Sequence, residues 1–362
     1  MTTMVYFNRK NTRKIKVGKL YIGGDAPITV QSMTNTDTHD IDATERQVRA
    51  LLERGCDIVR ITAPDIEAAR TFRALKERGI DAPLVADVHF DYRIAVACAE
   101  AGADKIRINP GNIGSQDNVR AVVRACAEGG VPIRIGVNSG SLEKEILKKY
   151  GKPSAEALAE SALYHASLLE KEGFFDIILS VKASSVPEMI KANRILRDST
   201  DYPLHLGVTE AGGGESAIVK SSVGIGALLA EGIGDTVRVS LTADPCDEIP
   251  VAREILKSLG LLPSSGMDIV SCPTCGRTRV DLISIVNDFK SRARERGLDK
   301  LNIKVAIMGC AVNGPGEARE ADLGIACGIG EGLIFKSGEI IRKVREEELV
   351  DSLISEIEGL QK

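Results

Sequence analysis

The 362-residue sequence contains no tryptophan, and aromatic residues make up only 4% of it. A surface on which nucleic-acid bases stack against aromatic rings is therefore not expected. The formal net charge of −4 at pH 7 provides no overall basic field that would draw the chain to nucleic acid or to an anionic membrane surface. We expect neither partner.

Long apolar runs are also missing. No stretch approaches the roughly 18 apolar residues of a membrane-spanning helix. The N-terminus is basic but lacks the apolar segment of a secretory signal, and we expect it to form a strand pair that closes the bottom of the fold. The eight cysteines do not have the spacing of a disulfide framework. These absences together predict a cytoplasmic protein.

Nucleotide-binding fingerprints are absent as well. No G-x-G-x-x-G follows any of the predicted strands, and the sequence has no G-x-x-x-x-G-K-[ST]. The sequence therefore gives no support for a bound nicotinamide, flavin or ATP.

Between residues 28 and 260 the sequence repeats one unit, in which a β-branched run is followed by a polar turn and an amphipathic helical pattern. The runs cover residues 28–33, 56–62, 82–90, 103–112, 131–138, 175–184, 202–212 and 235–245. Many helical patterns end in a glycine, which adopts the left-handed C-cap conformation at low cost: Gly55, Gly79, Gly102, Gly129, Gly173 and Gly232. Eight βα units predict a (β/α)8 TIM barrel, with a doubly wound open sheet as the alternative.

A break in this pattern marks a second domain. Residues 261–268, rich in proline, serine and glycine, interrupt the repeat as a linker. Beyond it, a helical pattern, three strand patterns and a closing helical pattern predict a small α+β domain. We place the domains at residues 1–262 and 263–362.

Polar side chains gather where the barrel strands end, which is where TIM barrels carry their chemistry. They are Arg60, Asp87, His89, Arg107, Asn109, Arg134, Asn138, Lys182, His205, Thr209, Glu210, Arg238 and Ser240. Strand alternation puts Lys105, Arg107 and Asn109 on one face and the intervening isoleucines on the other.

Five of these side chains are cations at equivalent points of successive strands: Arg60, Arg107, Arg134, Lys182 and Arg238. Burying so much like charge is costly unless anions neutralise it, so the pattern predicts a strongly anionic ligand, best a phosphate or diphosphate. The alternative is a set of solvent-facing arginines paired with helix acids. Glycine-rich loops at 109–115 and 210–217 could add backbone N–H groups to an anion site.

The second domain contains a C-x-x-C pair, Cys272 and Cys275, followed by Cys310 and then Glu317 in a Gly-Pro-Gly turn. Such a set can close on one metal centre, and spacing alone leaves structural zinc and an iron–sulfur cluster equally open. Cys327 could supply a fourth thiolate, but its apolar strand setting favours a core residue.

Five motifs together give a specific resemblance. They are VQSMTNTDT (30–38), RINPGN (107–112), RIGVNSGSL (134–142), CPTCGR (272–277) and GCAVNGPGE (309–317). In this order, across nearly the whole chain, they resemble the bacterial 4-hydroxy-3-methylbut-2-enyl diphosphate synthases, in the two-domain form. We see no departure at the motif positions.

The resemblance implies a [4Fe–4S] cluster held by Cys272, Cys275, Cys310 and Glu317, in a second domain of the ferredoxin or sulfite-reductase type. It implies reductive opening and dehydration of 2-C-methyl-D-erythritol 2,4-cyclodiphosphate to (E)-4-hydroxy-3-methylbut-2-enyl diphosphate, in the methylerythritol phosphate route to isoprenoids. Electrons would come from flavodoxin or ferredoxin. Family members are homodimers whose active site is shared between chains.

Joining this resemblance to the strand pattern gives each residue an expected role. The five cations would contact phosphate, with Asn109, Asn138 and Ser240 orienting the ligand beside Asp87, His205 and Thr209. Glu210 and His89 are the expected proton donors to the leaving hydroxyl. Glu317 would be the cluster ligand that yields to substrate. The competing hypothesis is a TIM-barrel lyase or carbon-transfer enzyme on a phosphorylated substrate, with a structural zinc in the small domain.

Overall fold

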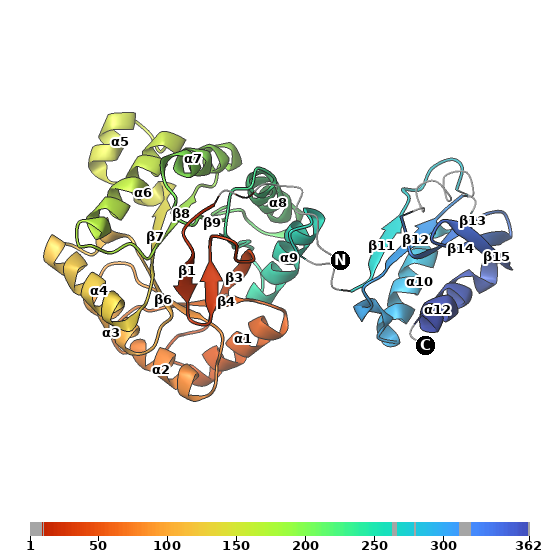
Figure 1. Ribbon diagram of the computed structural model, residues 1–362, viewed down its shortest axis with the longest axis horizontal. Coiled ribbons are helices and arrows are strands. Elements are labelled where there is room, and N and C mark those ends of the chain that lie inside the picture. Colours follow the sequence, from red (N-terminus) through yellow and green to blue (C-terminus); the bar gives the residue numbers. More distant parts are fainter. Residues whose placement is uncertain (1–8, 10, 263–265, 279, 311–319, 361–362) are drawn as a thin grey trace. The chain divides into compact units, whose positions relative to one another are not determined.

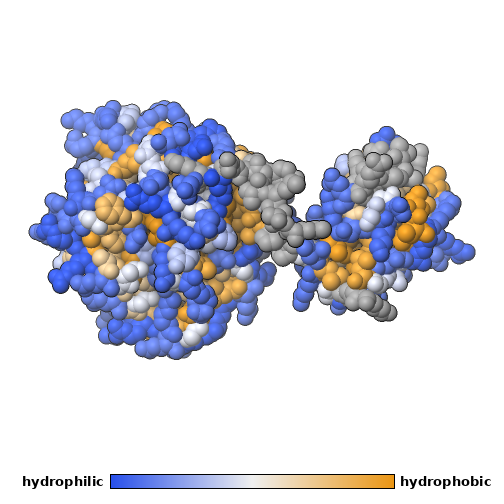
Figure 2. All heavy atoms as spheres, in the orientation of Figure 1, coloured by the Kyte–Doolittle hydropathy of each residue, from blue (hydrophilic) through white to orange (hydrophobic). Residues whose placement is uncertain are grey.

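The computed structural model describes residues 9, 11–262, 266–278, 280–310 and 320–360, and the chain divides into two compact units, Met1–Leu262 and Pro263–Lys362 (Figure 1). In Figure 2, hydrophilic side chains cover most of the face of the first unit that is in view, with smaller apolar areas between them. None of the helices in the described ranges has both the length and the apolar character needed to cross a membrane.

The first unit is the predicted TIM barrel. Eight parallel strands lie in the order β8-β7-β6-β5-β4-β3-β10-β9, and a parallel bridge between Leu179 and Leu204 joins the two ends. The strands are β3 (Thr29–Met33), β4 (Ile58–Thr62), β5 (Leu84–Asp87), β6 (Lys105–Ile108), β7 (Ile133–Asn138), β8 (Ile177–Lys182), β9 (His205–Leu206) and β10 (Thr236–Val237). Each of the eight predicted runs contains one of them, so the open-sheet alternative is wrong.

Helices surround the strands as a ring (Figure 1). They are α1 (Ile41–Glu53), α2 (Ala69–Glu77), α3 (Tyr92–Glu100), α4 (Gln116–Gly129), α5 (Lys144–Tyr150), α6 (Ala155–Glu170), α7 (Val186–Ser199), α8 (Gly214–Ala230) and α9 (Glu248–Ser258). Short 3₁₀ turns follow β6, β7 and β10 at Pro110–Asn112, Ser139–Ser141 and Pro245–Asp247. The outward-facing strand residues and the inner helix faces form one continuous apolar core.

Local sequence explains where these helices begin and end. The Asp40 side chain caps α1 by accepting from the Ala43 N–H, and Ser154 caps α6 in the same way. Five of the six predicted C-terminal glycines have positive φ, but Gly129 does not. There α4 runs one residue further and Gly130 takes the left-handed conformation, at φ 61°.

A hairpin of β1 (Ile15–Val17) and β2 (Leu20–Ile22) closes the N-terminal end of the barrel, as predicted. Its Ile15, Val17 and Ile22 are buried and pack against apolar residues near the starts of barrel strands, among them Ile58 and Val85. In Figure 1, β1 lies over the middle of the helical ring. The bottom of the barrel is therefore apolar, and the polar chemistry begins above it.

The second unit is a mixed five-stranded sheet covered by helices. Its strands lie in sequence order: β11 (Asp268–Ser271), β12 (Lys304–Met308), β13 (Leu323–Cys327), β14 (Glu331–Lys336) and β15 (Glu339–Arg345). The first three are parallel and the last two antiparallel. The helices are α10 (Leu282–Glu295) and α12 (Leu349–Gly359), with 3₁₀ turns at Leu298–Lys300 and Glu346–Glu348. Sequence analysis did not predict β11. The predicted linker, residues 261–268, included Asp268, the first residue of this strand.

Candidate functional site

A cavity of about 140 Å³ opens at the C-terminal ends of the barrel strands. Ten of the sequence-predicted residues line it together with Gly136 and Ser180: Arg60, Asp87, His89, Arg107, Arg134, Asn138, Lys182, Thr209, Arg238 and Ser240. Six of the ten lie at inward-facing positions of strands, whereas His89, Thr209, Arg238 and Ser240 lie in the segments that follow β5, β9 and β10.

Asp87 stands between two of the arginines. Its Oδ1 accepts from Arg107 Nη1 at 3.0 Å, and its Oδ2 lies 3.7 Å from Arg60 Nε. Burial by itself raises the pKa of the Asp87 carboxyl, but the neighbouring cations, Arg60 and Arg107 first, outweigh burial and lower it to about 2. Asp87 is therefore a carboxylate at neutral pH.

His89 is held in one tautomer by the same network. Its Nε2 lies 3.2 Å from Arg107 Nη1, and a guanidinium can only donate. Nε2 is therefore the acceptor, and the neutral ring carries its proton on Nδ1.

Glu248, which sequence analysis missed, is the second buried carboxylate at the site. It is 2% exposed and accepts from both Nε and Nη2 of Arg238 at 3.1 Å, and from Ser32 Oγ at 2.7 Å. The Glu248 carboxylate thus holds the Arg238 guanidinium through two hydrogen bonds, one to each oxygen. Only its position at the start of α9, two residues after Cys246, was visible in the sequence, and that position is ordinary for a glutamate.

The other two cations, Arg134 and Lys182, form no such ion pair within the part of the chain that the structure describes. Arg134 is 1% exposed, and neither its Nε nor its Nη1 has a hydrogen-bond partner among the described residues. Burial, followed by the charges of Arg60 and Arg107, places the pKa of Arg134 well below its usual value. Burial and neighbouring arginines do the same to the pKa of Lys182. An anion in the cavity would reduce the electrostatic repulsion between these buried cations.

Three predicted residues do not line the cavity. Asn109 caps its own turn, accepting from the Gly111 N–H at 3.2 Å. His205 is fully buried deeper in the barrel. Glu210 is exposed in the loop after β9, where its backbone has φ 53°, rare for a residue other than glycine.

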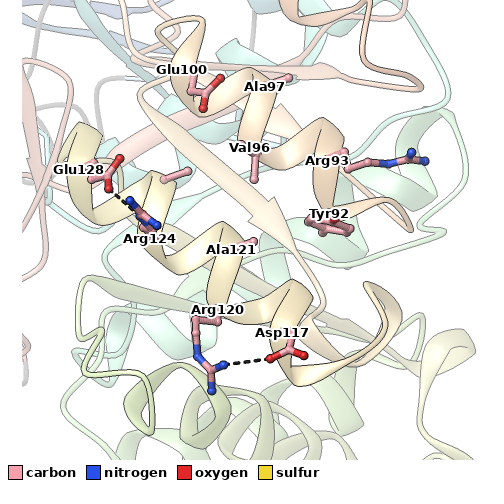
Figure 3. A pocket seen from close by; sticks show the side chains of 11 residues that line it. Tyr92, Arg93, Val96, Ala97, Glu100, Asp117, Arg120, Ala121, Arg124 and Glu128 are labelled. Carbon is pink, nitrogen blue, oxygen red and sulfur yellow. Dashed lines mark hydrogen bonds and ion pairs between the residues drawn. The ribbon is translucent and has the colours of Figure 1, made fainter.

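A larger hollow of about 660 Å³ lies outside the barrel between α3 and α4 (Figure 3). Apolar side chains such as Val96 and Ala121 line it, and the charges at its rim neutralise one another. Arg120 pairs with Asp117 and Arg124 with Glu128, both at 2.9 Å. The hollow between α3 and α4 therefore has no excess of positive charge, unlike the barrel cavity.

In the second unit, two predicted cluster ligands follow neighbouring parallel strands. Cys272 comes directly after β11, and Cys310 two residues after β12. The Gly309 N–H donates to Cys272 Sγ at 3.2 Å, which brings the two cysteine segments together. Cys275 is exposed, and hydrogen bonds from Arg277, the backbone N–H first, lower its thiol pKa.

These cysteines fit a thiolate centre, although within the described ranges no three His, Cys, Asp or Glu side chains already converge on one point. Glu317 lies outside the described residues. Cys327 is fully buried in the apolar core, where desolvation raises the pKa of its thiol to about 12. The expectation that Cys327 is a core residue is confirmed.

The chain matches two family models in succession. The GcpE TIM-barrel domain matches residues 12–253, and the GcpE protein C-terminal domain matches residues 268–359. The chain belongs to the GcpE family. This confirms the resemblance drawn from the five motifs.

Curated relatives carry the corresponding enzyme name, 4-hydroxy-3-methylbut-2-en-1-yl diphosphate synthase (flavodoxin). The protein of Clostridium perfringens is 58% identical over 353 residues, covering 98% of this chain and 100% of its own length. That of Ruminiclostridium cellulolyticum is 59% identical over 351 residues, covering 96% of this chain and 98% of its own. Among solved structures, a type I 3-dehydroquinate dehydratase from Clostridium difficile covers 69% of this chain and 99% of its own, with 13% identity and a TM-score of 0.52. That likeness shows the barrel fold alone.

Proposed function

We propose that this GcpE-family chain reductively opens and dehydrates 2-C-methyl-D-erythritol 2,4-cyclodiphosphate, giving (E)-4-hydroxy-3-methylbut-2-enyl diphosphate for isoprenoid synthesis. The observation that carries the proposal is the uncompensated positive charge of the barrel cavity. The names of near full-length relatives support it and favour it over a zinc-containing barrel lyase.

The charge count suits this ligand. Four arginines and Lys182 at the cavity face two buried carboxylates, Asp87 and Glu248, so the guanidiniums leave a surplus of two positive charges and Lys182 adds a third when it is protonated. The cyclic diphosphate has two strongly acidic hydroxyls and enters as a dianion. Opening the ring frees one phosphate end and adds a third negative charge. The surplus positive charge therefore meets the negative charge that develops on the departing phosphate as the ring opens.

Individual side chains divide the work of binding. Arg134 and Lys182, which form no ion pair with a carboxylate of the described residues, would take the phosphate oxygens most directly. Arg60 and Arg107 stay oriented by Asp87, and Arg238 by Glu248. Asn138, Thr209 and Ser240, which also line the cavity, would orient the ring through their amide and hydroxyl groups. Asn109 would act indirectly, by fixing the turn after β6.

Proton delivery falls to His89 or Glu210. While Arg107 occupies Nε2, the neutral His89 ring can donate only a hydrogen bond through Nδ1, so His89 would have to break that contact and take up a second proton to act as an acid. Glu210 is exposed at the end of β9 and would have to turn toward the ligand. Either could protonate the hydroxyl that leaves as water.

We further propose a [4Fe–4S] cluster held by Cys272, Cys275, Cys310 and Glu317. It would supply single electrons and an iron whose oxygen ligand can be displaced. The hydrogen bond from Gly309 to Cys272 and the lowered thiol pKa of Cys275 support thiolate ligation there. The electron donor would be flavodoxin, the word printed in the relatives' names, or ferredoxin. A cytoplasmic homodimer with shared active sites completes the proposal.

The test is an anaerobic EPR spectrum of the dithionite-reduced full-length protein, with and without the cyclic diphosphate, beside iron and zinc analysis. We expect a cluster signal that changes on adding the cyclic diphosphate, and formation of the open diphosphate. A colourless protein with one zinc per chain and no turnover would contradict the proposal and favour the hypothesis of a zinc-containing barrel lyase.

A further inference from the structure

Beneath the cavity, the barrel interior contains a further layer of buried polar side chains that do not line the cavity. Lys105 and His205 are both fully buried, on strands β6 and β9. Lys105 stands two residues before Arg107 on the same face of β6, one step further from the mouth. Both side chains lie between the charged cavity above and the apolar hairpin end below.

The polar atoms of this layer have no hydrogen-bond partners among the described residues. They are Lys105 Nζ, both ring nitrogens of His205, both amide atoms of Gln31, and the hydroxyls of Thr29 and Thr236. The strand register places Thr29, Thr236 and His205 side by side across β3, β10 and β9. An unpaired ammonium in such a place is expensive, whereas a neutral amine is not.

The charges around Lys105 are mostly of its own sign. Arg134 of β7 and Arg60 of β4 act on it, with the neutral ring of His205 nearby on β9, and within the described ranges the acid that acts on it is Asp104, just before β6. Asp104 is already engaged, pairing with Lys76 at 2.6 Å and accepting from the Leu84 N–H. Burial, then Arg134 and Arg60, place the pKa of Lys105 well below its usual value.

His205 is not the better acceptor. Burial first, and then neighbouring basic side chains with Arg134 foremost, place its pKa well below an ordinary value that is already near neutrality. Lysine starts from a much higher value, so an equal relief of charge brings Lys105 across neutral pH first.

We propose that Lys105 is a buried proton acceptor, neutral while the cavity is empty and protonated when the diphosphate ligand fills it. A dianion above Arg134 cancels most of the positive charge that opposes an ammonium at Lys105, so protonation of its amine costs less. Lys105 would thereby add a positive charge to the site only when a ligand is there to use it. The inference rests on the proposed diphosphate-binding function of the cavity.

The cyclic diphosphate is a suitable probe because neither of its two acidic phosphate hydroxyls titrates near neutral pH. A proton taken up on binding must therefore go to the protein. Isothermal titration calorimetry of the full-length protein, in buffers with different ionisation enthalpies, measures affinity and proton uptake together. We expect uptake approaching one proton per site, and a Kd that rises about tenfold per pH unit above neutrality.

Two variants identify the acceptor. Lys105→Met should abolish the uptake and give a pH-independent Kd, equal to that of wild type at high pH. His205→Gln should retain the uptake. Lys105→Gln replaces Lys105→Met if the latter does not fold, because wild-type uptake alone would not distinguish Lys105 from Lys182, whose pKa burial and arginines also lower.

Each outcome has a distinct meaning. Absence of binding heat in any buffer contradicts the proposed function of the cavity, and the inference with it. Binding heat that does not depend on the buffer contradicts proton uptake alone and leaves the proposed function standing. Uptake that survives in Lys105→Met, or is lost only in His205→Gln, assigns the proton elsewhere and overturns the role of Lys105.

Discussion

The carboxylate of Asp87 should contribute more to the folding stability of the ligand-free barrel than to that of the ligand-bound barrel. Replacing it by asparagine keeps the shape and an acceptor for Arg107 but removes the negative charge between two arginines. The Asp87 pKa falls from an ordinary 3.8 to about 2, and a shift of nearly two units corresponds to about 2.5 kcal/mol of folding free energy at neutral pH. For a domain of this size we expect Asp87→Asn to lower Tm by ~5–10 °C.

A diphosphate ligand should restore much of that loss, because its charges replace the missing carboxylate. The assay is thermal unfolding of wild type and Asp87→Asn by circular dichroism at pH 7, with and without the cyclic diphosphate. The matched control is Asp201→Asn, whose carboxylate pairs with Arg13 at 2.8 Å but is 54% exposed. An exposed pair contributes only about 0–1 kcal/mol, so this control should lower Tm by no more than a few degrees.

The pH dependence gives an independent check with a definite sign. The folded-state pKa of Asp87 is depressed, so its contribution is complete above pH 3.8 and is lost as the pH falls through about 2. Asp87→Asn should lack this part of the acid-unfolding profile. Equal Tm values for Asp87→Asn and the Asp201→Asn control, or no greater stabilisation by ligand in Asp87→Asn, would refute the charge argument.

Three further predictions concern the ligands, the cations and their orientation. Cys272→Ser should lose most bound iron and its visible absorption after anaerobic reconstitution, whereas Cys327→Ala should keep both, because Cys327 is a core residue. Arg134→Met should raise the Kd for the cyclic diphosphate about 10–100-fold by calorimetry, since a charge-assisted hydrogen bond is worth about 1.5–3 kcal/mol. Glu248→Gln should lower kcat/KM about tenfold through misplacement of Arg238. It should leave iron content and the EPR signal of the ligand-free protein unchanged, and a loss of iron would contradict the positioning role.

Periodicity and alternation sufficed to predict the barrel and most of its mouth. Alternation works because the side-chain period of a strand is fixed, so inward-facing residues such as Arg107 and Arg134 could be identified without a structure. Strand lengths were less predictable. The run at 202–212 contains only His205–Leu206 as a strand, since the hydrogen-bonded ladder ends before Gly207.

What the sequence could not reveal depends on contacts between distant segments. Glu248 lies 216 residues from Ser32, to which it hydrogen-bonds, and no local pattern marks such a pair. The polar layer beneath the cavity was missed for another reason. Gln31 and Thr29 read as ordinary members of an alternating strand. Only the closed barrel shows that they face inward and that their side chains have no hydrogen-bond partner among the residues described.

The spatial arrangement of the cations argues that they serve a ligand rather than the fold. Well-packed apolar residues usually stabilise a barrel interior better than buried charges do. Here a glycine keeps space for one of the charges instead. A Cβ at Gly136 would lie 2.5 Å from Arg107 Nε, and the two nearest atoms after it also belong to that guanidinium. A barrel selected for stability alone would fill this position, so the space at Gly136 supports the proposal that the cations bind an anion.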